Sequence, residues 1–280
     1  NVMKGAIECA DLVTTVSETY AKELMYPYYA HGLDGVLSAA AWKLTGITNG
    51  IDTNTFNPNT DPALPVHYSL RNYRKGKAAC KAALQEEVGL PQRPDVPLMV
   101  MVTRLAGHKG LDLLCHIARR LMWEEDCQLL ILGTGEPQFE NFFRDLSREF
   151  PDRVAAKITF NLGLAARIYA GGDIYLMPSK SEPCGLSQLM SMRYGTVPIV
   201  RETGGLNDTI SDSGDGEGNG FTFANYSASE LYDCCMRAYE GFQDTKGWRV
   251  LVKRAMQSDC SWKNSAKEYI RMYEDTMNLW

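Results

Sequence analysis

The segment Asp173-Ile-Tyr-Leu-Met-Pro-Ser-Lys-Ser-Glu-Pro-Cys-Gly-Leu-Ser-Gln188 decides the fold, and the rest of the chain is organised around it. Its first five residues form a short run of mainly apolar side chains, which predicts a buried strand. Leu189–Tyr194 follows and stops at Gly195, which predicts a short helix. The loop between them offers unpaired backbone N–H groups, the positive end of a helix dipole and one carboxylate, Glu182, so an anion can bind there. Taken alone, the loop favours the simpler interpretation, an ordinary strand–helix connection with a solvated glutamate.

Strands and helices alternate through the middle of the chain. Five strands are predicted, at Leu98–Val102, Leu129–Leu132, Val154–Thr159, Ile174–Met177 and Val197–Val200. Helices are predicted between and after them, at Leu111–Trp123, Gln138–Phe150, Leu164–Ala170, Leu189–Tyr194 and Leu206–Ile210. This regular alternation predicts an α/β fold with a doubly wound, Rossmann-like parallel sheet.

The two ends of the chain depart from this alternation. The first part contains a predicted strand and helix, then a loop with two glycines: Leu12–Val16, Glu18–Leu24 with Ser17 as its N-cap, Gly32 and Gly35. A stretch rich in Pro, Asn, Asp and Thr follows Asn49, which predicts a domain boundary there. Further helices are predicted at Arg71–Val88, Ala228–Gly241, Gly247–Gln257 and, capped by Ser261, Trp262–Met277. We therefore expect three parts, residues 1–48, 49–261 and 262–280.

The composition excludes several classes of protein. A net charge of −5 argues against a nucleic-acid partner. No apolar run is long enough to cross a membrane, so we expect no membrane partner. The 8 cysteines show neither Cys-x-x-Cys pairs nor zinc-ligand spacing, which favours a reducing, cytoplasmic compartment and argues against a metal site. Gly133-Thr-Gly135 lacks the third glycine of the dinucleotide fingerprint, because Gln138 takes its place, so a nicotinamide cofactor is disfavoured.

The residues that can do chemistry follow the predicted strands. Ligands of open α/β sheets bind beyond the carboxyl ends of the strands. The loops at those ends contain, in chain order, Arg104 and Lys109, Gly133 and Gly135, Phe160, Glu182, and Thr203-Gly-Gly-Leu206. Two cations, an aromatic ring, a carboxylate and glycine turns predict a site for a nucleotide diphosphate. Two alternatives stay open here: Arg104 and Lys109 as solvated loop charges, and Phe160 as a core residue.

Several motifs, in order and at the right spacing, resemble bacterial glycogen synthase and plant starch synthase. They are Glu182-Pro-Cys-Gly-Leu-x-Gln188, Arg104-x4-Lys109-Gly-Leu-Asp112, Asn49-Gly-Ile-Asp52 and Thr203-Gly-Gly-Leu-x-Asp-Thr209. The resemblance runs from Asn1 to the C-terminus. It implies a retaining glycosyltransferase of the GT-B architecture, in which two Rossmann-like domains face each other across a cleft. It also implies transfer of glucose from ADP-glucose to the non-reducing end of an α-1,4-glucan, without a metal or other cofactor.

The resemblance assigns roles to particular residues. Arg104 and Lys109 would hold the diphosphate and stabilise the charge on the departing ADP. Glu182 would hydrogen-bond to sugar hydroxyls beside the reacting carbon. The backbone N–H groups of Cys184, Gly185 and Leu186 would complete the sugar and phosphate cradle. Phe160 would pack on the adenine, near the turn with Gly133 and Gly135, which are also assigned to the nucleotide.

The sequence also departs from the family pattern. Met190 stands where other GT-B families have a second glutamate, and Ala166 stands where many relatives have a histidine. The family's N-terminal domain has no counterpart here beyond residues 1–48. We therefore expect a donor-binding half that transfers no glucose alone, leaves Leu12, Val13 and Val16 uncovered, and self-associates. A retaining transferase with another acceptor and a non-catalytic nucleotide-sugar-binding module are the alternatives, and the choice between ADP-glucose and UDP-glucose stays open.

Overall fold

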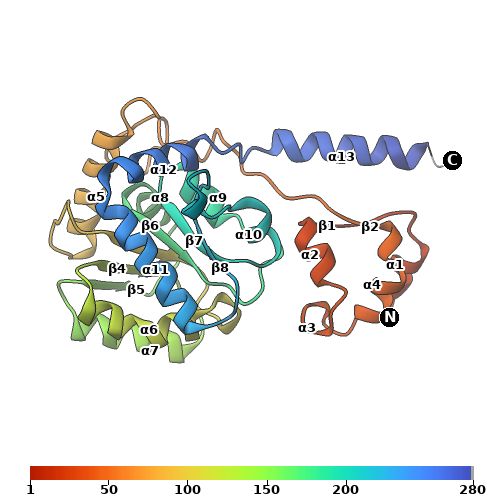
Figure 1. Ribbon diagram of the computed structural model, residues 1–280, viewed down its shortest axis with the longest axis horizontal. Coiled ribbons are helices and arrows are strands. Elements are labelled where there is room, and N and C mark those ends of the chain that lie inside the picture. The colour runs from red at the N-terminus through yellow and green to blue at the C-terminus, as the bar shows by residue number, and fades with distance from the viewer. Residues whose placement is uncertain (279–280) are drawn as a thin grey trace.

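A computed structural model describes residues 1–278 of the chain. Its centre is a six-stranded sheet in the order β5-β4-β3-β6-β7-β8, and every neighbouring pair of strands is parallel (Figure 1). The strands are β3 (Leu98–Val102), β4 (Gln128–Leu132), β5 (Val154–Lys157), β6 (Ile174–Met177), β7 (Val197–Arg201) and β8 (Phe221–Phe223). The chain winds outward from β3 to β5, crosses back to β6, and winds outward again to β8. The predicted doubly wound sheet is therefore confirmed, with its topological switch point between β3 and β6.

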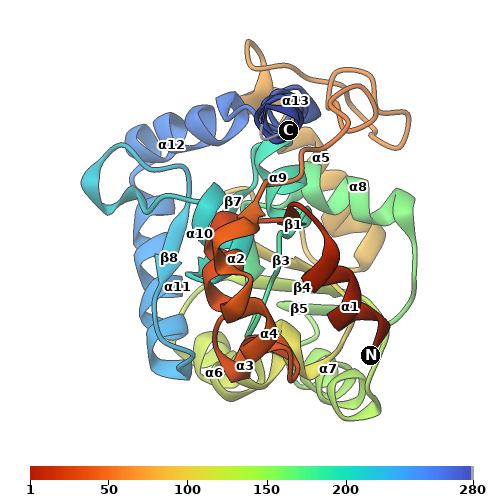
Figure 2. The same cartoon turned by 90° about the vertical axis from the view of Figure 1, so that its right-hand side faces the viewer.

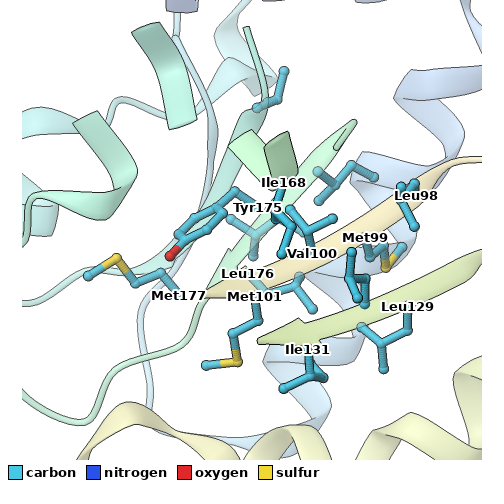
Figure 3. Packing of buried hydrophobic residues seen from close by; sticks show 14 of the residues in the cluster. Leu98, Met99, Val100, Met101, Leu129, Ile131, Ile168, Tyr175, Leu176 and Met177 are labelled. Atoms are coloured by element: carbon cyan, nitrogen blue, oxygen red, sulfur yellow. The ribbon is translucent and has the colours of Figure 1, made fainter. Parts of the chain in front are cut away.

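The central strands are apolar on both faces because helices cover both faces. All residues of β4, β6 and β7 are buried, and so are the first four residues of β3. Figure 3 shows the result: Met99 and Met101 of β3 lie on the same face of the sheet as Leu129 and Ile131 of β4, and Val100 lies on the opposite face among other buried side chains. Burial of this kind stabilises the sheet by about 1.5–3 kcal/mol for each large side chain.

Two groups of helices enclose the six-stranded sheet. The first group packs together and comprises α6 (Leu111–Glu124), α7 (Pro137–Glu149) and α11 (Ala228–Gln243). The second group also packs together and comprises α5 (Tyr73–Val88), α8 (Leu162–Gly171), α9 (Ser187–Arg193) and α12 (Thr245–Gln257). The short α10 (Gly204–Thr209) follows β7 at the carboxyl edge. Within residues 1–278, no helix combines the length and the apolar character needed to cross a bilayer.

Residues 1–46 form a second, much smaller unit. Its two strands, β1 (Val13–Thr15) and β2 (Leu44–Gly46), pair in parallel with each other and not with the larger sheet. Its helices are α1 (Val2–Cys9), α2 (Glu18–Glu23), α3 (Pro27–Ala30) and α4 (Asp34–Ala39). Figure 2 looks at this unit from the front, with α2 lying before α10 and β7. Contacts between α2 and α10 join the two units.

The last helix, α13 (Trp262–Met277), projects beyond the six-stranded sheet on the same side as residues 1–46 (Figure 1). Its base is fixed by the chain that links the two units, since Ser265 Oγ donates to Thr48 O and Ile51 N donates to Cys260 O at 2.7 Å. Ile270 and Tyr273 on this helix are exposed. Tyr269 beside them is only half-buried.

The structure corrects several sequence predictions. A sixth strand, β8, follows the Ser211–Gly220 loop, and α1, α3 and α4 occupy segments that were assigned no element or a loop. Leu12, Val13 and Val16 are half-buried and not uncovered, because α1, α2 and α4 pack around the small sheet. Ser17 caps α2 as predicted, by accepting from Tyr20 N at 2.9 Å. Ser261 precedes α13 as predicted but does not cap it, because its hydroxyl donates to Asp259 Oδ1 at 2.7 Å.

Candidate active site

The switch point between β3 and β6 brings two predicted site residues into contact. Lys109 lies in the loop after β3 and Glu182 in the loop after β6, and these strands are neighbours in the sheet. Lys109 Nζ lies 2.6 Å from Glu182 Oε2, and the two side chains are only 18% and 10% exposed. Ser179 Oγ donates to the same carboxylate oxygen at 3.2 Å. A charge-assisted pair of this kind holds a carboxylate and an ammonium side by side at the rim of the sheet.

The backbones of these two loops fit closely against each other. Gly110 has a φ of +73°, and a Cβ there would lie 1.9 Å from Pro178 O. Only glycine therefore fits at this position, whatever binds nearby. Lys180 N also donates to His108 O at 2.9 Å. These contacts fix where Lys109 and Glu182 stand relative to each other.

Arg104 lies at the outer side of the same loop. Its Nη2 is 3.4 Å from His108 Nε2. Burial lowers the pKa of His108, and the nearby charges of Lys109 and Arg104 lower it further. His108 is therefore neutral near pH 7 and can accept a hydrogen bond from Arg104. His108 was not predicted as a site residue, although its position within the Arg104–Lys109 loop was the available signal.

Gly133 and Gly135 pack against the neighbouring loop of the chain. A Cβ on Gly133 would lie 1.8 Å from Thr103 O, and one on Gly135 would lie 2.2 Å from Leu105 O. Leu105 N donates to Thr134 O at 2.9 Å, which interlocks the loops after β3 and β4. The close approach of two backbones thus explains why Gly133 and Gly135 are glycines. Their assignment to the nucleotide stays a prediction.

Phe160 follows β5 at the edge of the sheet and is 81% exposed. Its alternative interpretation as a core residue is therefore wrong. An exposed ring at the carboxyl edge of the sheet is available for stacking on a flat ligand. Its predicted contact with adenine remains a prediction.

The side chain of Gln188 donates hydrogen bonds to backbone carbonyl groups of the loop from Glu182 to Leu186. Gln188 Nε2 lies 3.2 Å from Cys184 O and 3.1 Å from Gly185 O, and Gly185 has a φ of +72°. Cys184 is buried, and burial raises the pKa of its thiol, so it is protonated near neutral pH. Leu186 is partly exposed at the start of α9. A buried, protonated thiol is a poor nucleophile, so Cys184 is not a candidate nucleophile. The assignment of the Cys184 and Gly185 N–H groups to the ligand stays a prediction.

The turn at the start of α10 packs on the same loop. Gly205 N donates to Glu182 O at 3.1 Å. A Cβ on Gly204 would lie 2.1 Å from Glu182 O, and one on Gly205 would lie 2.2 Å from Cys184 O. The two glycines of the Thr203-Gly-Gly-Leu206 motif therefore allow this turn to support the loop that carries Glu182.

Residues 1–46 reach this turn through α2. Glu23 Oε1 accepts from Thr203 Oγ1 at 2.8 Å and from Gly204 N at 3.0 Å. Asp208 at the other end of α10 accepts from Ser17 Oγ at 2.6 Å and from Thr19 N at 3.2 Å. These contacts could not be predicted from the sequence, because they join residues about 180 positions apart in the chain.

A third contact between the two units involves Lys180 of the loop that carries Glu182. Its ammonium lies 5.3 Å from the ring centre of Tyr28 on α3 and 5.6 Å from that of Tyr226. Both distances fit cation–π attraction. The Tyr226 hydroxyl also donates to Asp112 in the first turn of α6, which fixes this ring. The smaller unit thus touches the loop that carries Glu182 as well as α10.

Fold and site together define an α/β protein with a charged rim at the switch point of a doubly wound sheet. The family model described as "Glycosyl transferases group 1" matches residues 85–241, and the model described as "Starch synthase catalytic domain" matches residues 1–39. The chain belongs to the group 1 glycosyl transferases.

Two curated relatives, both named glycogen synthase, are similar over nearly the whole chain. The one from Exiguobacterium sibiricum is 50% identical over 275 residues, which is 98% of this chain and 57% of the relative. The one from Bacillus licheniformis is 49% identical over the same shares. The chain thus spans a little over half the length of the relatives it matches. The resemblance to glycogen and starch synthases is confirmed.

Two solved structures have similar folds. The catalytic domain of starch synthase IV from Arabidopsis thaliana, bound to ADP and acarbose, matches with a TM-score of 0.92 and 36% identity. It is matched over 99% of this chain and 58% of that chain. Sucrose-phosphate synthase from Thermosynechococcus elongatus matches with a TM-score of 0.67 and 21% identity, over 100% of this chain and 61% of that chain, which shows the fold alone. The predicted relation to the GT-B fold is confirmed.

Proposed function

We propose that this chain carries the donor site of a glycogen or starch synthase. The reaction is transfer of glucose from ADP-glucose to the non-reducing end of an α-1,4-glucan, with retention of configuration. The observation that carries the proposal is the Lys109–Glu182 pair at 2.6 Å, placed at the switch point of the sheet. The names of the relatives support the glucan product, and the ADP bound to starch synthase IV supports an adenine nucleotide.

The proposed chemistry follows from the charges at the rim. The bond between the glucose carbon and the diphosphate breaks, and negative charge builds on the departing ADP. Arg104 and Lys109 pair with this charge, so they do what a metal ion does in other transferases, and we propose that no metal is needed. Neutral His108 does not repel the Arg104 guanidinium and can accept one of its hydrogen bonds, which leaves the other N–H groups of Arg104 for phosphate.

Glu182 has a different proposed role. Its carboxylate accepts hydrogen bonds from hydroxyls of the donor sugar and lies near the carbon where positive charge develops. The backbone N–H groups of Cys184, Gly185 and Leu186 hold the remaining sugar and phosphate oxygens. Phe160 covers one face of the adenine, and Gly133 and Gly135 form the turn below it. Binding in this way orients the donor for attack by the acceptor hydroxyl.

The acceptor is proposed to bind mainly outside this chain. The curated relatives are longer, since this chain covers only 57% of them, and the activity in their names belongs to the longer proteins. A transfer reaction needs donor and acceptor held together with water excluded. We therefore propose that the chain alone binds the donor, transfers no glucose and self-associates through exposed residues such as Trp42, Ile270 and Tyr273.

A reducing, cytoplasmic compartment is part of the same proposal. All eight cysteines are unpaired in the part of the chain that the structure describes.

One titration series tests the donor proposal. The chain is titrated by calorimetry with ADP, UDP, ADP-glucose and UDP-glucose. Saturable binding of the adenine pair, tighter than the uridine pair, is the expected result. Binding of the uridine pair alone would instead favour a transferase with another donor. Binding of none of the four by a folded chain would remove the proposed function.

A second assay separates the synthase from its alternatives. The chain is incubated with ADP-glucose and a glucan primer, and ADP release is measured. No primer-dependent release is expected from the chain alone. Release at an ordinary enzymatic rate would show that residues 1–280 suffice for transfer and would refute the proposed place of the acceptor.

A further inference from the structure

A pocket lies away from the rim that carries Lys109 and Glu182. It has a volume of about 470 Å³ and lies between α5 on one side and α11 and α12 on the other. Asp173, which precedes β6, lines it, so the pocket lies at the amino edge of the sheet, opposite the carboxyl edge that holds the candidate active site. Its volume is within the range of small-molecule sites.

The back of this amino-edge pocket is formed by two lysines of α5 that already have partners. Lys81 Nζ pairs with Asp173 Oδ2 at 2.6 Å. Lys77 Nζ donates to neutral oxygens only, among them Gly172 O at 2.8 Å and Thr196 Oγ1 at 2.9 Å. Lys81 is therefore paired with a carboxylate, whereas Lys77 forms no ion pair with any described residue and burial lowers its pKa to about 8.

The mouth of the pocket carries two more cations. Arg74 on α5 and Arg249 on α12 both line it, and neither side chain forms an ion pair within residues 1–278. Both lie near the Tyr73 hydroxyl, which donates to Arg249 O at 3.1 Å. The pocket is thus lined by four cations and by only two carboxylates, Asp95 and Asp173. This excess of positive charge occurs in a chain whose net charge is −5.

Aromatic rings line the remaining wall. Trp248 of α12 and Phe242 of α11 are arranged edge to face, with ring centres 5.5 Å apart. Phe242 also lies 5.3 Å from Lys81 Nζ. Flat apolar surfaces next to unpaired guanidinium groups suit a ligand that has an uncharged ring and a compact anionic group.

We propose that the amino-edge pocket binds a small organic phosphate. Its phosphate oxygens pair with Arg74 and Arg249, and its uncharged part lies against Trp248 and Phe242. A neutral oligosaccharide would use the aromatic wall but would leave both guanidinium groups without a partner, so the charge pattern favours the phosphate. The site is separate from the proposed donor site and adds a second ligand to the protein.

The test uses the complete chain with Lys109→Ala, so that binding at the carboxyl edge does not dominate the signal. Glucose 1-phosphate, inorganic phosphate and maltotriose are titrated separately, and binding is followed by calorimetry. We expect saturable binding of glucose 1-phosphate at millimolar concentration, weaker binding of inorganic phosphate and none of maltotriose. Adding Arg74→Gln and Arg249→Gln should weaken glucose 1-phosphate binding by about tenfold or more, since two charge-assisted contacts are lost.

The matched control is Arg271→Gln, an exposed arginine on α13 that lies outside the pocket. It should leave the affinity unchanged, and thermal unfolding curves should show that all variants fold. Binding of maltotriose as tight as that of glucose 1-phosphate would make the pocket a neutral-sugar site and overturn the proposal. Binding of neither phosphate, or affinity unchanged by Arg74→Gln and Arg249→Gln, would overturn it as well. Because the readout does not involve ADP, the result is independent of the proposed transferase function.

Discussion

The two parallel sheets of this molecule differ in what holds them together. The six-stranded sheet has a continuous core that runs through both of its helical layers. The two-stranded sheet of residues 1–46 has a core of four buried residues, Ile7, Ala30, Leu37 and Ala40. Trp42 in the smaller unit is 80% exposed. The larger unit is therefore stabilised from within, whereas the smaller one depends more on polar contacts with its neighbour.

This difference also separates two contributions to the site. The residues proposed to touch the donor all lie on loops of the larger sheet. The smaller unit supplies Glu23, Ser17 and Tyr28, which touch α10 and the Glu182 loop from outside. We infer that the larger unit binds the donor and that the smaller unit positions the loop on which Glu182 lies. Substitutions confined to one unit at a time test this division.

The largest effect is expected at Glu182. In a full-length protein that contains this chain, Glu182→Gln should lower turnover by about 10²–10³-fold, the scale of losing one electrostatic contact to a transition state. The affinity of the chain for ADP should stay the same or rise, because Lys109 loses the carboxylate with which it now pairs. Turnover and ADP calorimetry measure the two quantities. A loss of ADP affinity in proportion to turnover would make Glu182 a nucleotide ligand.

The next largest effect is expected when a buried leucine is removed from the core of each unit in turn and the stability of the protein is measured. Leu130 is fully buried in β4, so Leu130→Ala should lower the free energy of unfolding by about 2–5 kcal/mol. Leu37→Ala in the small core removes the same number of carbon atoms but should shift the main urea transition much less, because the larger core does not depend on it. Urea unfolding followed by circular dichroism measures both. Equal shifts would show that the two units unfold as one.

A smaller effect is expected from Glu23, which ends α2. A carboxylate there is unfavourable for its own helix, and the N–H of Gly204 and the Thr203 hydroxyl offset this by donating to it. Glu23→Gln keeps an acceptor oxygen but loses the charge, so it should weaken the docking of residues 1–46 by about 1–2 kcal/mol, less than the loss of a whole hydrogen bond to a charged group. Hydrogen exchange of α2 should then become faster. Glu18→Gln, an exposed change in the first turn of the same helix, is the control: it loses only a favourable interaction with the helix dipole, about 0.3–1 kcal/mol, and should have the smaller effect.

The smallest effect is a pH dependence confined to the larger unit. Burial raises the pKa of Asp212, but hydrogen bonds from Arg237, Thr222 N and Gly214 N outweigh burial and hold it below its usual value. The folded pKa is thus lower than the unfolded one, so this stabilisation is present above about pH 4 and is lost as the pH falls further. Because Asp212 is partly exposed, the contribution is about 1 kcal/mol. Asp212→Asn should lower stability at pH 7 and flatten its acid dependence, whereas an unchanged acid dependence would contradict this account.

The larger sheet could be predicted from sequence because its signals are local. Five of its six strands are apolar runs followed by helices, so their order in the chain predicts the winding. β8 was not predicted, because it has only three residues, Phe221–Phe223, and follows a loop rich in Gly, Asp and Ser. In residues 1–46, Pro27, Gly32 and Gly35 pointed to a loop, yet α3 and α4 form there around the small core. Tertiary packing outweighed the local signals.

The candidate site also contains features that could be predicted from local sequence signals and features that depend on the three-dimensional fold. Lys109 and Glu182 could be predicted to share one edge, because the carboxyl ends of parallel strands meet there. Their direct pairing depends on β3 and β6 being neighbours, which the strand order in space decides. Gln188 lies within a motif that was recognised, but its hold on Cys184 O and Gly185 O depends on the fold of the loop. Glu23 could not be found, because no local pattern connects it with Gly204.

The central claim is that the loops after β3 and β6 hold a nucleotide diphosphate through Lys109. The most direct measurement is calorimetric titration of ADP into the unaltered chain, into Lys109→Ala and into Lys253→Ala, an exposed lysine on α12. We predict that Lys109→Ala weakens ADP binding by about 1.5–3 kcal/mol, the range for a hydrogen bond to a charged group, and that Lys253→Ala leaves it unchanged. Equal ADP affinity of the unaltered chain and Lys109→Ala would contradict the claim.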